Sequence, residues 1–207
     1  VRVRAYNGTL WSAWGTSASV LMANVPDAPV ITGITAGIGQ LSVAYTVAVD
    51  GGSPVTNVAY STDNGSSWTT PAPPSTANPL VITGLTNGTT YQVRIKAISA
   101  AGTGAASTAT PGRPGLVPGA PTALTAKSKV KKKASLAWAA PLVTGGLPIT
   151  SYRVLAKRTG VAAAAKTTTA RTLTWTGLTR KKYYTFTVYA CNAIGCSAAK
   201  TIRIKIK

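Results

Sequence analysis

The chain has 207 residues, 45% of them hydrophobic and 12% charged, and a formal net charge of +19. This composition can bury one or two cores and excludes an intrinsically disordered chain. Histidine and glutamate are absent, and the acids are Asp27, Asp50 and Asp63, which excludes a nucleophile activated by a histidine base and leaves few groups for acid–base catalysis.

No apolar run approaches the roughly 18 to 20 residues that a membrane-spanning helix needs, so we expect no transmembrane segment. Residues 1–8, VRVRAYNG, lack the basic and then apolar layout of a signal peptide. If the protein is exported, we expect its signal upstream of these residues.

Short runs of alternating apolar and polar residues recur along the chain, whereas helical periodicity is hard to find. The runs occupy residues 41–47, 57–61, 90–99, 134–140, 150–158, 172–178, 183–190 and 200–207. Such alternation, interrupted by Gly, Pro, Asn and Ser, predicts half-buried antiparallel strands. The sequence therefore predicts an all-β fold.

The chain also repeats itself, because the segments VRVRAYN, VRIKAIS and FTVYACN can be superimposed. Ala5 and Ala97 are 92 residues apart, and Ala97 and Ala190 are 93 apart, so the repeating unit has the size of a seven-stranded sandwich. We expect the last two strands of one unit in residues 1–24, a complete unit in 25–112 and a second complete, basic unit in 113–207.

Further landmarks recur in register. The segments GLTNGTTY and GLTRKKYY each place a leucine six residues before a tyrosine, Tyr91 in the first and Tyr184 in the second. Bulky aromatics occupy matching positions of an early strand, Tyr45 in LSVAYTV and Trp138 in ASLAWAA. We expect both aromatics in the cores of their units.

Together with the starts PDAP and PGAP, these landmarks are similar to tandem fibronectin type III domains of bacterial secreted or cell-surface proteins, over essentially the whole chain. The resemblance implies tandem seven-stranded antiparallel β-sandwiches of the immunoglobulin-like kind. It also implies that Tyr91 and Tyr184 are structural residues whose hydroxyls tether the loop before the sixth strand. Tyr45 departs from the tryptophan that is commoner in the family.

Residues 60–68, YSTDNGSSW, contain S-x-D-x-G-x-x-W, which resembles the Asp box of sialidase-type propellers. A propeller would repeat this box in each blade, and a common glycosidase would need two carboxylates flanking the sugar bond; the chain has one such box. Asp-Asn-Gly is also a strong hairpin signal. We therefore interpret the segment as a hairpin turn that Asp63 caps, that Gly65 completes and across which Trp68 packs.

Cys191 and Cys196 bracket the turn between the last two strands. The counterparts of this pair in the other units are Ile98 with Thr103 and Tyr6 with Trp11. Two cysteines at this spacing supply neither a four-ligand metal site nor a CxxC redox motif. We expect a disulfide that closes a short loop, with free thiols as the alternative. A disulfide indicates an oxidising compartment, so we expect an extracellular protein, secreted or attached to the cell surface.

Positive charge gathers in the last unit. Of the 22 Lys and Arg residues, five lie in residues 1–116 and 17 in residues 117–207, where there is no acid. The turns between the first two and between the fifth and sixth strands lie at the same end of such a sandwich, so their cations could form one polyanion patch. The candidate residues are Lys127, Lys129, Lys131, Lys132, Lys133, Arg180, Lys181 and Lys182.

A patch of this kind attracts polyanions by releasing their counterions. Sequence-specific nucleic acid is not favoured, because neither interleaved aromatics nor a recognition helix accompanies the charge. Anionic cell-wall polymers, acidic polysaccharides and lipid surfaces fit equally well, and the alternative is that the charge only keeps the protein soluble. We expect no cofactor and no metal site.

The repeats, the Pro-rich linkers and the lack of a catalytic set predict a protein that is not an enzyme. Our first hypothesis is a structural or adhesive spacer or stalk whose partners are other domains or copies of the same protein, packed in a surface filament or appendage. The alternatives are an anchor that binds a polyanion or the cell wall through the last unit, and accessory modules of a secreted glycoside hydrolase.

Overall fold

The computed structural model describes residues 2–16 and 23–207, and every named element in them is a strand. No described helix is long and apolar enough to cross a membrane. The strands are β1 (Arg2–Val3), β2 (Gly15–Thr16), β3 (Val30–Gly37), β4 (Gln40–Thr46), β5 (Val55–Ser61), β6 (Leu80–Ile82), β7 (Tyr91–Ser99), β8 (Gly102–Thr103), β9 (Thr110–Gly112), β10 (Thr122–Lys127), β11 (Ala134–Ala139), β12 (Ser151–Lys157), β13 (Ala164–Thr168), β14 (Thr172–Trp175), β15 (Tyr183–Cys191) and β16 (Lys200–Lys205).

Strands β1 and β2 pair as an antiparallel hairpin. Within it, Tyr6 and Trp11 form a cross-strand pair whose ring centroids are 4.6 Å apart. The Arg4 guanidinium lies over the rings of Trp11 and Trp14. Residue 1 and residues 17–22 of the expected first segment lie outside the described residues.

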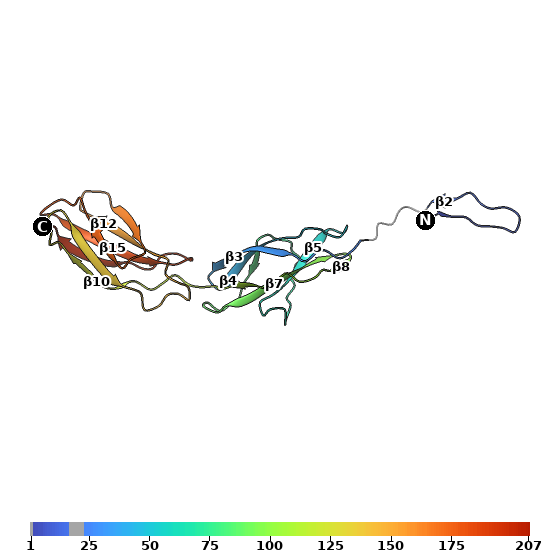
Figure 1. Ribbon diagram of the computed structural model, residues 1–207, viewed down its shortest axis with the longest axis horizontal. Coiled ribbons are helices and arrows are strands. Elements are labelled where there is room, and N and C mark those ends of the chain that lie inside the picture. Colours follow the sequence, from blue (N-terminus) through green and yellow to red (C-terminus); the bar gives the residue numbers. More distant parts are fainter. Residues whose placement is uncertain (1, 17–22) are drawn as a thin grey trace.

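The second unit is a sandwich of two sheets (Figure 1). One sheet has the order β3-β4-β6, and in the other β7 pairs with β5, β8 and β9. Inward-facing residues of both sheets fill the core, in agreement with the alternation along each strand. The core residues are Leu41, Val43, Tyr45, Val58, Leu80, Ile82, Val93 and Ile95.

The last unit repeats this architecture with the sheets β10-β11-β14 and β13-β12-β15-β16, so the all-β fold of tandem antiparallel sandwiches is confirmed. The last unit has a full edge strand, β13. In the described part of the second unit, the corresponding segment forms a single bridge, between Tyr60 and Thr69. Pro71, Pro73 and Pro74 follow Thr69, and because proline has no N–H to donate to a ladder, this segment does not continue as a strand.

The two core aromatics differ in how their polar atoms are satisfied. Tyr45 and Trp138 are both buried. The Tyr45 hydroxyl donates to the Thr76 carbonyl at 3.2 Å, and burial raises the pKa of this tyrosine. The indole Nε1 of Trp138 is buried without a hydrogen-bond partner among the described residues.

The tyrosine corners tie the loop between the sheets in both units. The Tyr91 hydroxyl accepts the backbone N–H of Thr86 at 2.9 Å, and the Tyr184 hydroxyl accepts that of Thr179 at 3.1 Å. Burial alone would raise the pKa of Tyr184, but hydrogen bonds with Thr179 and the charge of Arg158 outweigh it, so this pKa is lowered. Each tyrosine therefore fixes the turn directly before its own strand, β7 for Tyr91 and β15 for Tyr184.

The linker between the complete units is hydrogen-bonded to the second unit. The N–H of Gly115 donates to the Gly37 carbonyl at 3.0 Å, and the N–H of Gly88 donates to the Pro114 carbonyl at 2.8 Å. The Arg113 side chain adds a bond from Nε to the Gly88 carbonyl at 2.7 Å. The start of the linker thus belongs structurally to the unit before it.

The same linker is also hydrogen-bonded to the last unit. The N–H of Leu116 donates to the Gly145 carbonyl at 2.7 Å, and Asn192 Nδ2 donates to the Leu116 carbonyl at 2.7 Å. A disulfide joins Cys191 and Cys196 across the turn that holds Asn192. The disulfide therefore stabilises the turn whose Asn192 side chain is hydrogen-bonded to the linker.

The two units meet where Gly146 faces Gly88. A Cβ at Gly146 would lie 2.7 Å from the Gly88 Cα, closer than real Cβ atoms approach. Only glycine therefore allows the backbones to come this close. In Figure 1 the two sandwiches follow one another end to end.

Candidate functional site: the basic end of the last unit

Three segments meet at the end of the last unit that faces away from the second unit: the β10–β11 turn, the β14–β15 turn and the C-terminal residues (Figure 1). The Lys132 carbonyl accepts the Leu178 N–H at 3.0 Å, and the Lys132 N–H donates to the Lys207 carbonyl at 3.3 Å. The Lys181 N–H donates to the Ile206 carbonyl at 2.8 Å. Backbone bonds therefore hold the lysine-bearing turns together.

We call this surface the basic end, and it contains all eight candidate cations of the sequence prediction, each of them exposed. They are Lys127, Lys129, Lys131, Lys132, Lys133, Arg180, Lys181 and Lys182. Lys157 and Arg158 lie beside them and were missed by the sequence reasoning. The antiparallel pairing of Lys157 with Thr185 brings the end of β12 next to the β14–β15 turn, and this neighbourhood could have been inferred from the strand order.

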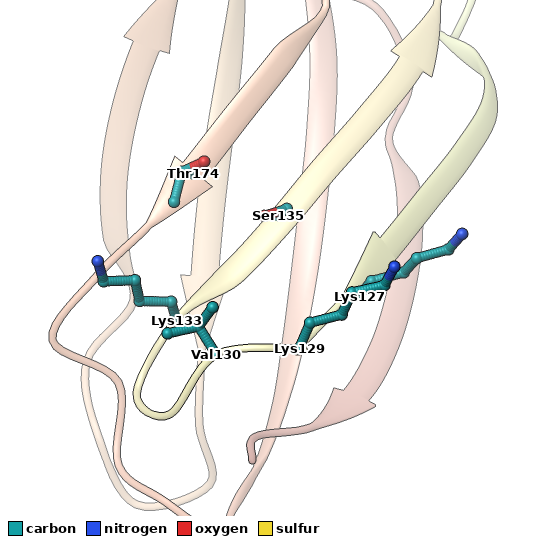
Figure 2. Close-up of a pocket in the computed structure, with 6 residues that line it drawn as sticks. All are labelled: Lys127, Lys129, Val130, Lys133, Ser135 and Thr174. Carbon is teal, nitrogen blue, oxygen red and sulfur yellow. The ribbon is translucent and has the colours of Figure 1, made fainter.

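A hollow of about 350 Å³ opens beside the β10–β11 turn. Figure 2 shows Ser135 and Thr174 on its floor, with Lys133 extending to one side and Lys127 and Lys129 to the other. The hollow forms because these outward-facing positions carry small side chains between long lysine side chains. An anionic chain lying on this face would meet hydroxyl groups between ammonium groups.

Two lysines of the basic end occupy backbone conformations that suit glycine. Lys132 has φ 57° and Lys181 has φ 59°. The equivalent residues of the second unit are Gly39 and Gly88: the Gly39 carbonyl accepts the Leu85 N–H as Lys132 accepts that of Leu178. An L-residue in the left-handed region costs about 1 kcal/mol or more. The last unit thus carries charge at positions where the second unit has the conformationally favoured residue.

Electrostatics at the basic end are one-sided. Residues 64–207 contain no Asp or Glu, so these cations have no side-chain carboxylate within their own unit. Their charges repel one another and raise the local concentration of anions. The arrangement can bind negative charge and cannot supply a carboxylate for acid–base chemistry.

The Asp-box segment forms a hydrogen-bonded turn on the second unit. Asp63 Oδ1 accepts the Ser67 N–H at 2.9 Å and the Ser61 hydroxyl at 2.7 Å, and Oδ2 accepts the Ser67 hydroxyl. Gly65 has φ 94°, and Trp68 Nε1 donates to its carbonyl at 3.0 Å. Trp68 thus folds back across the turn, in a sandwich and not in a propeller blade.

The turn predicts a pH effect. Hydrogen bonds from the Ser67 hydroxyl, the Ser61 hydroxyl and the Ser67 N–H hold the pKa of Asp63 well below its ordinary value of 3.8. Because the folded pKa is lowered, the stabilisation is present above about pH 3.8 and is lost as the pH falls further. We expect chemical denaturation to show a smaller loss of stability between pH 5 and pH 2 in Asp63→Asn than in the wild type.

Ser67→Ala should lie between the two, because it removes the bond from the Ser67 hydroxyl to Asp63 Oδ2, which lowers the pKa of Asp63. The bond from the backbone N–H of residue 67 to Asp63 Oδ1 remains, so the effect should be partial. An Asp63→Asn variant with the full pH dependence of the wild type would contradict this account.

Comparison with known proteins decides the family. Residues 30–113 and 119–205 each match the sequence profile of the Fibronectin type III domain. The chain belongs to the fibronectin type III family. The first matched segment begins directly after PDAP and ends one residue beyond β9, and the second begins within PGAP and ends with β16.

Solved fibronectin type III structures agree in fold. The chain is similar to the FN1–FN3 domains of chicken CNTN1, with a TM-score of 0.66 at 17% identity, covering 100% of this chain and 75% of that one. It is also similar to domains A168–A170 of titin, with a TM-score of 0.63 at 20% identity, covering 100% and 74%. At these identities the likeness concerns the fold alone.

A relative by sequence is Chitinase A1 of Niallia circulans, which is 33% identical over 192 residues. The match covers 89% of this chain and 26% of the relative, so the chain spans about a quarter of that protein.

Within the described residues, no group of three or more His, Cys, Asp or Glu side chains could hold a metal ion.

Proposed function

We propose that the chain is a non-catalytic spacer of an extracellular protein, which keeps the parts attached to its two ends at a set distance and orientation. The observation that carries this proposal is the linker, whose backbone is hydrogen-bonded to both complete units where Gly88 meets Gly146. A flexible tether would have a solvated linker. The disulfide supports an oxidising, extracellular location.

The similarity to part of a chitinase supports one setting for such a spacer. Since the relative is named for an enzyme and the chain matches about a quarter of it, the repeats would be accessory modules of a secreted glycoside hydrolase. They would separate its catalytic part from another part of the same enzyme.

The spacer proposal predicts that the two units of the full chain tumble as one body. Residual dipolar couplings should give one common alignment tensor for residues 30–112 and 120–205 in the wild type. In Gly146→Ala the new Cβ would overlap the Gly88 backbone, so the units must separate and the two tensors should differ in magnitude.

Gly52→Ala is the matched control. Gly52 has φ 81° and Gly146 has φ 83°, so alanine is similarly strained at both, but no described atom lies within 4 Å of a Cβ at Gly52. This variant should keep the common tensor. Two different tensors in the wild type would overturn the spacer proposal.

A second function is favoured by the basic end: attachment to an anionic polymer. The specific observation is that Lys132 and Lys181 stand where the second unit has Gly39 and Gly88, although neutral turns would be easier to form. We expect the full chain to be retained on an anionic polymer resin and released steeply as salt is raised. Passage through the resin without delay at physiological salt would exclude this function.

A further inference from the structure

A second concave surface lies next to the basic end, on the outer face of the four-stranded sheet of the last unit. It is a groove of about 540 Å³ between the end of β12 and the strands β15 and β16. The residues that line it are Lys157, Thr159, Gly160, Tyr183, Thr185 and Arg203. A smaller hollow next to it adds Arg158 and Lys182. None of the residues that line the groove was among the predicted candidates, whereas Lys182 of the adjoining hollow was.

The groove contains an arginine held by an aromatic ring. Arg203 pairs across the ladder with Thr185, and its guanidinium carbon lies 4.6 Å from the ring centroid of Tyr183. Tyr183 is 50% exposed. The ring restricts the guanidinium and leaves it at the surface, so less side-chain entropy is lost when an anion binds.

No side-chain carboxylate of the last unit neutralises this arginine, because the unit has no Asp or Glu. A guanidinium offers a planar fork of donors that matches a planar carboxylate. The hydroxyl groups of Thr159, Thr185 and Tyr183 line the same groove and can both donate and accept hydrogen bonds. Cations, hydroxyls and an exposed ring in one groove are suited to a sugar that carries an acid.

We propose that this groove binds an acidic saccharide, with Arg203 receiving the carboxylate of a uronic acid and the neighbouring hydroxyl groups bonding to those of the sugar ring. The inference rests on the attachment function and names the ligand class for it. Binding of single-stranded nucleic acid would instead use successive aromatic platforms for the bases, and Tyr183 is the one aromatic residue that lines this groove.

The test is calorimetric titration of the full chain with a tetramer of galacturonic acid, at physiological and at low salt. Arg203→Lys keeps the charge and loses the fork, and Tyr183→Leu loses the ring and the hydroxyl. Each should weaken tetramer binding about tenfold or more. A tetramer of neutral galactose should not bind.

The chain offers a matched control on the same outer face. Arg153 lies opposite Tyr189 on β15, with its guanidinium carbon 6.0 Å from the ring, outside the groove. Arg153→Lys and Tyr189→Leu should leave tetramer affinity unchanged. Circular dichroism and thermal unfolding of all four variants would show that the fold is kept.

The outcomes separate the groove from the attachment function. If the chain is retained on polygalacturonate but Arg203→Lys binds the tetramer as the wild type does, the groove inference is wrong and attachment stands. If a five-nucleotide thymidine oligomer binds as tightly as the tetramer and Arg203→Lys weakens both equally, the saccharide assignment is wrong. If no anionic polymer is retained, both proposals fail.

Discussion

Replacing Lys132 and Lys181 together by glycine is expected to weaken binding of the full chain to an anionic polymer about 30-fold at physiological salt. A lysine close to an anionic surface contributes about 1 kcal/mol, and about 2 kcal/mol corresponds to this factor. The dependence of binding on salt should become less steep, because fewer counterions are released.

The same variant should fold at least as well as the wild type. Both lysines have positive φ, at 57° and 59°, which glycine adopts without a steric penalty. The gain is partly offset because glycine is more flexible in the unfolded chain, so we expect the free energy of unfolding to rise by no more than about 1 kcal/mol. Binding and stability would therefore move independently.

Arg171→Gln with Lys200→Gln is the control for charge alone. It also removes two positive charges, but from the other half of the unit. There Lys200 pairs with Val188, and the Arg171 carbonyl accepts the Trp138 N–H. Retention on the polymer should change much less than in the glycine variant. Equal losses in both would mean that net charge, and not the basic end, determines binding.

Phe186→Ala is expected to have the largest effect on stability, a loss of about 3–5 kcal/mol from the last unit. Phe186 has no exposed surface, and its ring centroid lies 6.0 Å from that of Trp175 and 6.3 Å from that of Tyr184. Removing it leaves a cavity among rigid aromatic rings that cannot collapse easily. Since a domain is stable by about 5–15 kcal/mol, part of the last unit should unfold at moderate denaturant.

Urea denaturation followed by tryptophan fluorescence measures this loss. Val93, also without exposed surface, occupies the equivalent place in the second unit, and Val93→Ala should cost less because it removes fewer buried atoms. A loss below about 1 kcal/mol for Phe186→Ala would show that the core can close around the missing ring.

The fold could be predicted from the sequence because its rules are local or repeated. Alternation around Val93 and Phe186 identified buried strand faces, and the spacing of Ala5, Ala97 and Ala190 identified the unit length. The weak edge of the second unit was not anticipated, although three prolines after Thr69 were visible. Periodicity detects strands but says little about which edge of a sheet is occupied.

The candidate site was predictable only in part. The lysine-bearing turns could be placed together because the order of strands in this sandwich puts both turns at one end. The pairing of Tyr183 with Arg203 depends on the register of β15 against β16, which is fixed by packing and not by residue spacing. The contact of Gly146 with Gly88 likewise joins two units whose relative position no single-unit pattern specifies.

The exchange of glycine for lysine also makes the two complete units differ at their far ends. In the second unit, Gly88 is the residue that meets Gly146 of the next unit. The same position in the last unit is Lys181, which carries a charged, flexible side chain. The bare contact between glycine backbones that joins the two complete units therefore has no equivalent residue at the basic end, where Lys181 is exposed to solvent and to anions.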